Sequence, residues 1–155
     1  MAAASTVDFW LQNAGRYPLL TAAQEITLSK AVHEWLHCDN PSPQEIRRGK
    51  KAKERIINSN LRMVVTVAKK FFARVAHNAN ISLEDVLQEG VLGLDRAAEK
   101  FDYSKGYKFS TYAYWWIRQG MGRYVEVQSK TIKVGSLCTQ LHNKWVNRPE
   151  GMTIE

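Results

Sequence analysis

Apolar residues recur every three to four positions along most of the chain, which is the spacing of one face of an α-helix. The longest apolar stripe lies between residues 56 and 71 and consists of Ile56, Ile57, Leu61, Val64, Val65, Val67, Ala68 and Phe71. A second stripe, between residues 86 and 98, consists of Val86, Leu87, Val91, Leu92, Leu94 and Ala98. The alternation typical of strands is weak. The pattern predicts an all-α fold, a compact bundle of about five or six helices.

Capping residues and breaks set the expected ends of these helices. The predicted helices cover residues 6–14, 21 to the break at 39–43, 42–77, 82–98, 110–128 and 136–146. Thr21 with Gln24, and Ser42 with Glu45, have the spacing of capping boxes, and Ser82 is a favoured N-cap. A tight loop is expected over 102–109 and an extended segment over 131–134. Two helical glycines, at positions 90 and 93, cost about 1 kcal/mol each against alanine, so a packing or partner contact is expected there.

Composition excludes several classes of protein. The chain has 155 residues, 45% of them hydrophobic, which is enough for one buried core. Its longest apolar runs fall far short of the roughly 20 residues that span a bilayer, and its first residues lack the pattern of a secretory signal. Cys38 and Cys138 cannot form a disulfide framework. We therefore expect a globular, cytoplasmic protein with no membrane partner.

Charge is distributed in blocks. Residues 44–77 sum to +8 and residues 100–133 to +5, while residues 78–99 between them sum to −4. The basic blocks favour a polyanionic partner, and the acidic block suggests a second partner of opposite charge. These charge blocks fit solvated helix faces at least as well, so a binding partner can be inferred only with a second, independent observation.

That observation is a cluster of aromatic residues. Nine of the chain's 16 aromatic residues lie between positions 101 and 124: Phe101, Tyr103, Tyr107, Phe109, Tyr112, Tyr114, Trp115, Trp116 and Tyr124. Four cations lie among them and Lys100 directly precedes them, and rings at successive 100° steps of a helix cannot all face a core. Exposed rings among cations suit an unpaired nucleic-acid strand, whose bases stack and whose phosphates pair with the cations. The alternative is an aromatic-rich helix that belongs to the core.

Signatures of enzyme active sites are weak or missing in this sequence. His33, Glu34 and His37 fit the H-E-x-x-H pattern of zinc proteases. A catalytic zinc needs a third protein ligand, and the remaining histidines, His77 and His142, lack a family spacing. There is no nucleotide-binding P-loop, nucleophile elbow or C-x-x-C pair. We expect no enzyme activity, no cofactor and no metal site, and a generic helical DNA-binding protein stays as an alternative.

Four segments together resemble a known family. Residues 101–119, FDYSKGYKFSTYAYWWIRQ, closely resemble the promoter-melting segment of bacterial sigma factors of the sigma-70 family. Residues 60–70 resemble that family's core helix, residues 85–94 its polymerase-binding helix, and residues 15–26 its region 1.2. The resemblance covers about residues 6–134, in the family's order.

The resemblance implies a domain organisation. Residues 1–40 would hold the helices of region 1.2, residues 41–134 sigma domain 2, and residues 135–155 a short C-terminal helix and tail. Domains 3 and 4 of the family, including the reader of the −35 element, would be absent. The chain would then be either a piece of a longer factor or a naturally short one. A naturally short one would resemble the truncated late sigma factors of some bacteriophages, for which a co-activator or clamp protein replaces −35 recognition.

The resemblance also implies partners and site residues. Asp85, Gln88 and Glu89 match positions that dock on the clamp helices of the largest catalytic subunit of bacterial core RNA polymerase. Tyr112 matches the ring that stacks on a base flipped from the non-template strand of the −10 element, and Trp115 and Trp116 match the wedge beside it. Gln119 matches the reader of the last paired position. The full expected DNA-binding set is Phe101, Lys105, Lys108, Phe109, Thr111, Tyr112, Trp115, Trp116, Arg118, Gln119 and Arg123.

Some positions depart from the family's usual residues. Gly122 and Tyr114 stand where primary factors usually carry Thr, and Lys105 stands in place of a common Arg. Val91 and Asp95 replace the usual Asn and Met of the docking helix. We expect an altered promoter preference from the first three departures.

Overall fold

The computed structural model describes residues 6–72, 75, 81–129, 138, 141 and 145 of the chain. These residues form α1 (Thr6–Gly15), α2 (Ala22–His37), α3 (Pro43–Ala68), α5 (Leu83–Lys100) and α6 (Phe109–Gln128), with 3-10 turns η1 (Lys69–Phe71) and η2 (Tyr103–Lys105). The described part of the chain contains no strand, so the predicted all-α fold is confirmed. None of its helices is both long and apolar enough to cross a membrane.

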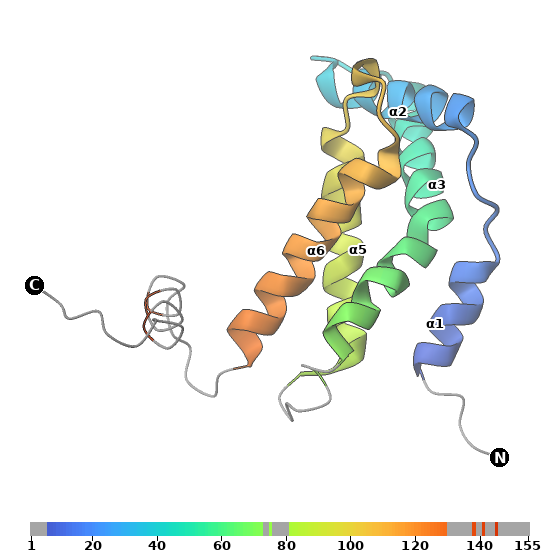
Figure 1. The fold of residues 1–155 in the computed structure, drawn as a ribbon. Coiled ribbons are helices and arrows are strands. Elements are labelled where there is room, and N and C mark those ends of the chain that lie inside the picture. The colour runs from blue at the N-terminus through green and yellow to red at the C-terminus, as the bar shows by residue number, and fades with distance from the viewer. Residues whose placement is uncertain are drawn as a thin grey trace, which may run out of the picture.

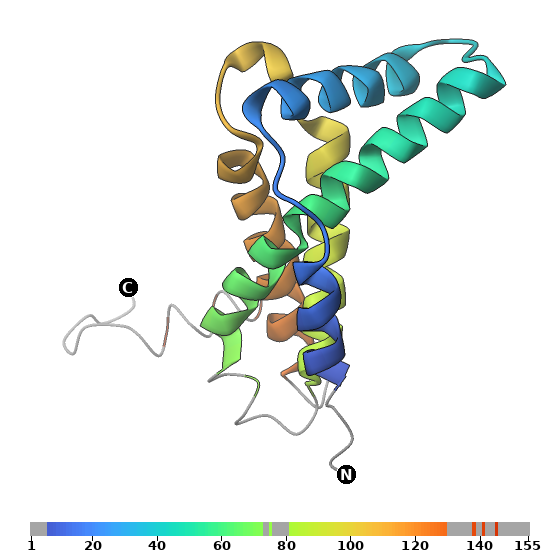
Figure 2. The same cartoon turned by 90° about the vertical axis from the view of Figure 1, so that its right-hand side faces the viewer.

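The helices form a bundle around α5. Figure 1 shows α6 and α3 running beside α5, α1 alongside α3, and α2 across one end of the bundle. The turned view in Figure 2 shows α2 and the first half of α3 extending together to one side. The most extensive interface joins α5 to α6, and the next joins α2 to α3.

The helix starts follow the predicted caps. In both capping boxes the N-cap hydroxyl accepts a hydrogen bond from the backbone N–H of the third helical residue, whose side chain accepts one from the N-cap backbone N–H: Thr21 with Gln24, and Ser42 with Glu45. The hydrogen bond from the Ser42 backbone N–H, followed by that with the Ser42 hydroxyl, lowers the pKa of Glu45. Ser82 caps α5 through the backbone N–H of Glu84 at 3.2 Å. Local sequence therefore determines where these helices begin.

One predicted helix differs from the structure, and two predicted segments near the C-terminus lie wholly or largely outside the described residues. The helix expected to reach residue 77 is interrupted after Ala68 by η1, which places Phe71 in the core, and Phe72 and Val75 are α-helical again. The prediction was therefore wrong about the uninterrupted α-helix up to Phe71, and most of residues 73–80 lie outside the described residues. The extended segment expected over 131–134 also lies outside them, as does nearly all of the helix expected over 136–146.

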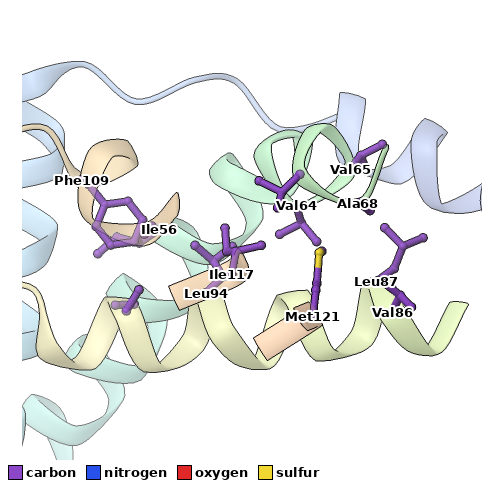
Figure 3. Packing of buried hydrophobic residues seen from close by; sticks show 14 of the residues in the cluster. Ile56, Val64, Val65, Ala68, Val86, Leu87, Leu94, Phe109, Ile117 and Met121 are labelled. Atoms are coloured by element: carbon purple, nitrogen blue, oxygen red, sulfur yellow. The ribbon is translucent and has the colours of Figure 1, made fainter. Parts of the chain in front are cut away.

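The core is built from the predicted apolar stripes. Figure 3 shows Met121 of α6 pointing toward Val64 of α3, with Leu87 and Leu94 contributed by α5. Most positions of both stripes are buried or half-buried. Leu92 is an exception at 52% exposure, because it lies off the face that α5 turns toward α3 and α6.

The two long helices α5 and α6 approach each other closely at glycines. A Cβ at Gly93 would lie 2.7 Å from the carbonyl oxygen of Trp116, and one at Gly120 would lie 2.9 Å from that of Glu89. Backbone atoms cannot move aside as a flexible side chain can. Glycine at these positions is therefore a packing requirement, and it fixes how α6 lies on α5.

An ion-pair cluster ties α3 to α5. Lys53 Nζ lies 2.8 Å from the Asp95 carboxylate and 2.7 Å from that of Glu99. Burial alone would lower the pKa of Lys53, but hydrogen bonds and attraction from Asp95 and Glu99 outweigh burial and raise it. Asp95, one of the residues that depart from the family's usual pattern, is thus engaged in an ion pair within the chain.

Candidate nucleic-acid and polymerase interface

The first half of α6 carries a cluster of aromatic rings around Tyr112. The ring of Tyr112 lies 5.8 Å from Phe101, 6.3 Å from Tyr107 and 6.2 Å from Trp116, measured between centroids. Tyr112 itself is half-buried. Its position is therefore set by neighbours from both α6 and the segment after α5, while part of the residue stays accessible to solvent.

Two of the expected DNA-binding residues lie in the core. Phe101 is 5% exposed and Phe109 is 1% exposed, and their rings meet edge-on at 5.2 Å. Direct contact with DNA is closed to side chains buried to this extent. The ring of Phe101 also packs against that of Tyr112, so these two core residues border the aromatic cluster from the inside of the fold.

The two tryptophans differ in exposure. Trp115 is 63% exposed, with the guanidinium carbon of Arg118 at 5.9 Å from its ring centroid. Trp116 is half-buried between Tyr112 and the ammonium group of Lys100, which lies 5.0 Å from its ring centroid. The prediction that the rings of this helix cannot all lie inside is confirmed by Trp115.

The remaining expected DNA-binding side chains are exposed along residues 105–123. They are Lys105, Lys108, Thr111, Arg118, Gln119 and Arg123. Lys105 lies 3.9 Å from the carboxylate of Asp102 in an exposed pair, while Asp102 accepts hydrogen bonds from both the N–H and the hydroxyl of Ser104. These bonds from Ser104 are the main cause of the lowered pKa of Asp102. All four cations of this set are therefore open to solvent, and Arg118 among them lies against an exposed ring, that of Trp115.

A contact between Lys70 and Tyr114 on this surface was not predicted from the sequence. Lys70 Nζ of η1 donates a hydrogen bond to the Tyr114 hydroxyl of α6 at 2.9 Å. This bond, followed by the charges of Lys70 and Arg118, lowers the pKa of Tyr114. The ring of Tyr114 meets that of Trp115 edge-on at 5.6 Å. Only the departure of residue 114 from the family pattern pointed to it in the sequence.

The expected polymerase-binding residues lie on one helix. Asp85 and Gln88 are exposed on α5 and Glu89 is half-buried. The Tyr124 hydroxyl of α6 donates to Asp85 at 3.1 Å, and burial together with Asp85 raises the pKa of Tyr124. Glu89 and Tyr124 also line a cavity of about 370 Å³ with Arg96 and Arg123. The residues expected to bind polymerase and the last residue of the expected DNA-binding set therefore adjoin at the α5–α6 interface.

The H-E-x-x-H segment forms a helix end. The His33 and His37 rings stack at 3.9 Å, and His37 Nδ1 lies 3.0 Å from the carbonyl oxygen of His33. Within the described ranges, no group of three or more His, Cys, Asp or Glu side chains could hold a metal. His77 and His142 lie outside the described residues. The two stacked histidines therefore gain no third ligand in the part of the chain that the structure covers.

Comparison with known proteins gives the family directly. The model of sigma-70 factor region 1.2 matches residues 6–37, and that of sigma-70 region 2 matches residues 56–131. RNA polymerase sigma factor SigA4 of Synechococcus elongatus is 44% identical over 136 residues, covering 83% of this chain and 42% of that relative. RNA polymerase sigma factor SigA2 of the same organism is 39% identical over 165 residues, covering 89% of this chain and 50% of that relative.

A third relative, the RNA polymerase sigma-C factor of a Nostoc species, is 45% identical over 121 residues, covering 76% of this chain and 28% of that relative. The chain thus spans half or less of the length of these relatives. The matched regions contain both the aromatic surface of α6 and the acidic face of α5. The chain belongs to the sigma-70 family of RNA polymerase sigma factors and carries that family's region 1.2 and region 2.

Proposed function

We propose that this chain acts in transcription initiation, where it binds core RNA polymerase and opens promoter DNA at an A/T-rich −10-like element. Family membership and the names of its relatives support this role. The helices of residues 1–40 would serve as region 1.2 and residues 41–134 as domain 2. No catalytic step is assigned to the chain itself.

Polymerase binding is proposed for the acidic face of α5. Asp85, Gln88 and Glu89 are spaced to share one side of a helix, and two of them are exposed. An acidic face suits the clamp helices of the largest catalytic subunit if these present basic side chains. The hydrogen bond from Tyr124 to Asp85 would hold this carboxylate in place for docking.

Promoter opening is proposed for the aromatic surface of α6. The observation that carries this proposal is that Trp115 stands 63% exposed, three residues along the helix from the half-buried, ring-supported Tyr112. Extruding a base costs a few kcal/mol, and stacking on an aromatic ring returns about 1–3 kcal/mol per base. Trp115 would replace the stacking lost at the edge of the opened duplex, while Tyr112 would stack on the extruded base.

The promoter preference is proposed to differ from that of primary factors. Gly122 offers no side chain where Thr is usual, one turn after Gln119, the expected reader of the last paired position. TA steps are easily unstacked, which favours an A/T-rich target. A promoter-selection assay with the holoenzyme tests this, and recovery of the ordinary primary consensus would refute it. Adding a host protein fraction to the same assay tests the expected co-activator.

The central test measures binding of a fluorescent, A/T-rich non-template strand with and without core polymerase. We expect tight binding only with polymerase, weaker binding to a scrambled strand, and loss of this difference in Tyr112→Ala. The matched control Tyr112→Phe keeps the stacking ring and should bind nearly as well as the wild type. If binding ignores polymerase, sequence and Tyr112 alike, the surface is an electrostatic patch and the proposed function is wrong.

A further inference from the structure

Three side chains from two segments meet beside the exposed Trp115. Lys70 comes from η1, directly after α3, while Tyr114 and Arg118 lie one turn apart on α6. Lys70 donates to the Tyr114 hydroxyl at 2.9 Å, and Arg118 is close enough to lower the pKa of Tyr114 by its charge and a hydrogen bond. The contact joins residues 44 positions apart, so it exists only because α3 and α6 pack together.

The hydrogen bonds of this group leave several donors unused. A lysine ammonium group has three N–H donors, of which one goes to Tyr114. The tyrosine oxygen accepts that bond, which leaves its own O–H free to donate. The guanidinium group of Arg118 has five donors. Three different side chains can therefore donate toward one acceptor at this point.

The charges of the group are also uncompensated. In the described part of the chain, no carboxylate forms an ion pair with Lys70 or Arg118. In contrast, Lys53 of α3 is neutralised by Asp95 and Glu99. A pair of cations sharing a phenol donor, with no internal anion, has the composition of an anion-binding site.

We infer that Lys70, Tyr114 and Arg118 together bind one backbone phosphate of the promoter DNA, next to the point where Trp115 would replace the lost stacking. The inference rests on the proposed function, because that function places Trp115 at the edge of the opened duplex. It adds Lys70 and Tyr114 to the DNA-binding residues expected from the family resemblance.

Tyr114 contacts both Lys70 of the proposed phosphate site and the exposed Trp115. Its hydroxyl contacts Lys70, and its ring packs edge-on against Trp115 at 5.6 Å. A phosphate held at the hydroxyl would therefore lie a fixed distance from the tryptophan. Phosphate contacts of this kind set the register of a protein on DNA and carry no base preference.

The test uses holoenzyme and a promoter fork in which single phosphates near the upstream edge of the opening are replaced by uncharged methylphosphonates. We expect one position at which the replacement weakens wild-type binding about tenfold, as for loss of a charge-assisted hydrogen bond. In Tyr114→Phe and in Lys70→Gln the same replacement should have little further effect. The controls Tyr17→Phe and Lys51→Gln, exposed residues away from this group, should keep the full wild-type effect.

Failure of the inference and failure of the proposed function give different results. If every methylphosphonate acts equally on the wild type and on both variants, the phosphate site is refuted, whatever Tyr112→Ala does. If binding instead ignores sequence and Tyr112, the proposed function fails, and the phosphate site is then read from salt dependence on single-stranded DNA. There, Lys70→Gln should lower the slope of log affinity against log salt by about 0.7, and an unchanged slope would refute the site.

Discussion

Glu25 of α2 accepts a hydrogen bond from the backbone N–H of Phe109, 84 residues later, at 3.4 Å. Phe109 is the first residue of α6, and its N-cap, Lys108, offers no side-chain cap. A carboxylate from the region 1.2 helix thus takes the place of the missing cap and lies at the positive end of the α6 dipole. This bond ties region 1.2 to the start of the helix that carries Tyr112 and Trp115.

Removing this distant cap should destabilise the fold. We expect Glu25→Ala to lower the free energy of unfolding by about 1 kcal/mol, the usual worth of an N-cap, because an N–H at the start of α6 loses its acceptor. Urea unfolding followed by circular dichroism measures this. The control Glu34→Ala, on the same helix, removes only an exposed pair with Lys30 and should cost less than about 0.5 kcal/mol. Equal losses in the two variants would contradict the capping role.

The close approach of α5 and α6 should not tolerate a methyl group. We expect Gly120→Ala to lower the free energy of unfolding by about 1–3 kcal/mol, because its Cβ would meet the backbone oxygen of Glu89 at 2.9 Å. Gly15→Ala is the matched control, since nothing lies within 4 Å of its added Cβ. Thermal unfolding distinguishes the two, and a Gly120→Ala protein as stable as Gly15→Ala would show that the helices can separate without cost.

The ion-pair cluster predicts a pH-dependent stability. We expect Lys53→Met to cost about 1–2 kcal/mol near neutral pH, because Asp95 and Glu99 then face each other without a cation. This is less than the 3–5 kcal/mol typical of a fully buried pair, since the two carboxylate side chains are 36% and 38% exposed. Urea titrations of both proteins at neutral pH measure the difference.

The sign of the pH effect follows from the raised pKa of Lys53. A group whose pKa is higher in the folded state contributes its full stabilisation below the unfolded value, here 10.5, and loses it as the pH rises through the folded value. The wild type should therefore keep its advantage over Lys53→Met through neutral pH and lose it in the strongly alkaline range. An advantage that disappears already below pH 9 would contradict the assignment.

The missing side chain at position 122 can be restored. A Cβ there would lie 4.0 Å from the ring of Phe71, which is ordinary contact, so Gly122→Thr should fold as well as the wild type. If Gly122 contributes to an altered promoter preference, the variant holoenzyme should select promoters closer to the primary consensus. Sequencing of promoters selected by the two holoenzymes measures this. An unchanged promoter set would remove residue 122 from the determinants of specificity.

Much of the fold could be predicted because its determinants are local. Capping boxes at Thr21 and Ser42 act over three residues, and the apolar stripes of α3 and α5 follow from helix geometry alone. The family resemblance was likewise carried by short, contiguous segments. The 3-10 turn that follows α3 was not predicted, because burial of Phe71 in this turn depends on the packing of other helices around it.

Taken by itself, the sequence determined the helices, the family and the set of aromatic and charged residues near position 112, since each depends on residues close together in the chain. Only the tertiary structure decided which of them face solvent. Phe109 became core while Trp115 stayed 63% exposed, because the glycine contact of α5 with α6 sets the rotation of α6. The pairs Glu25–Phe109 and Lys70–Tyr114 were decided there too, because packing brings together residues 84 and 44 positions apart.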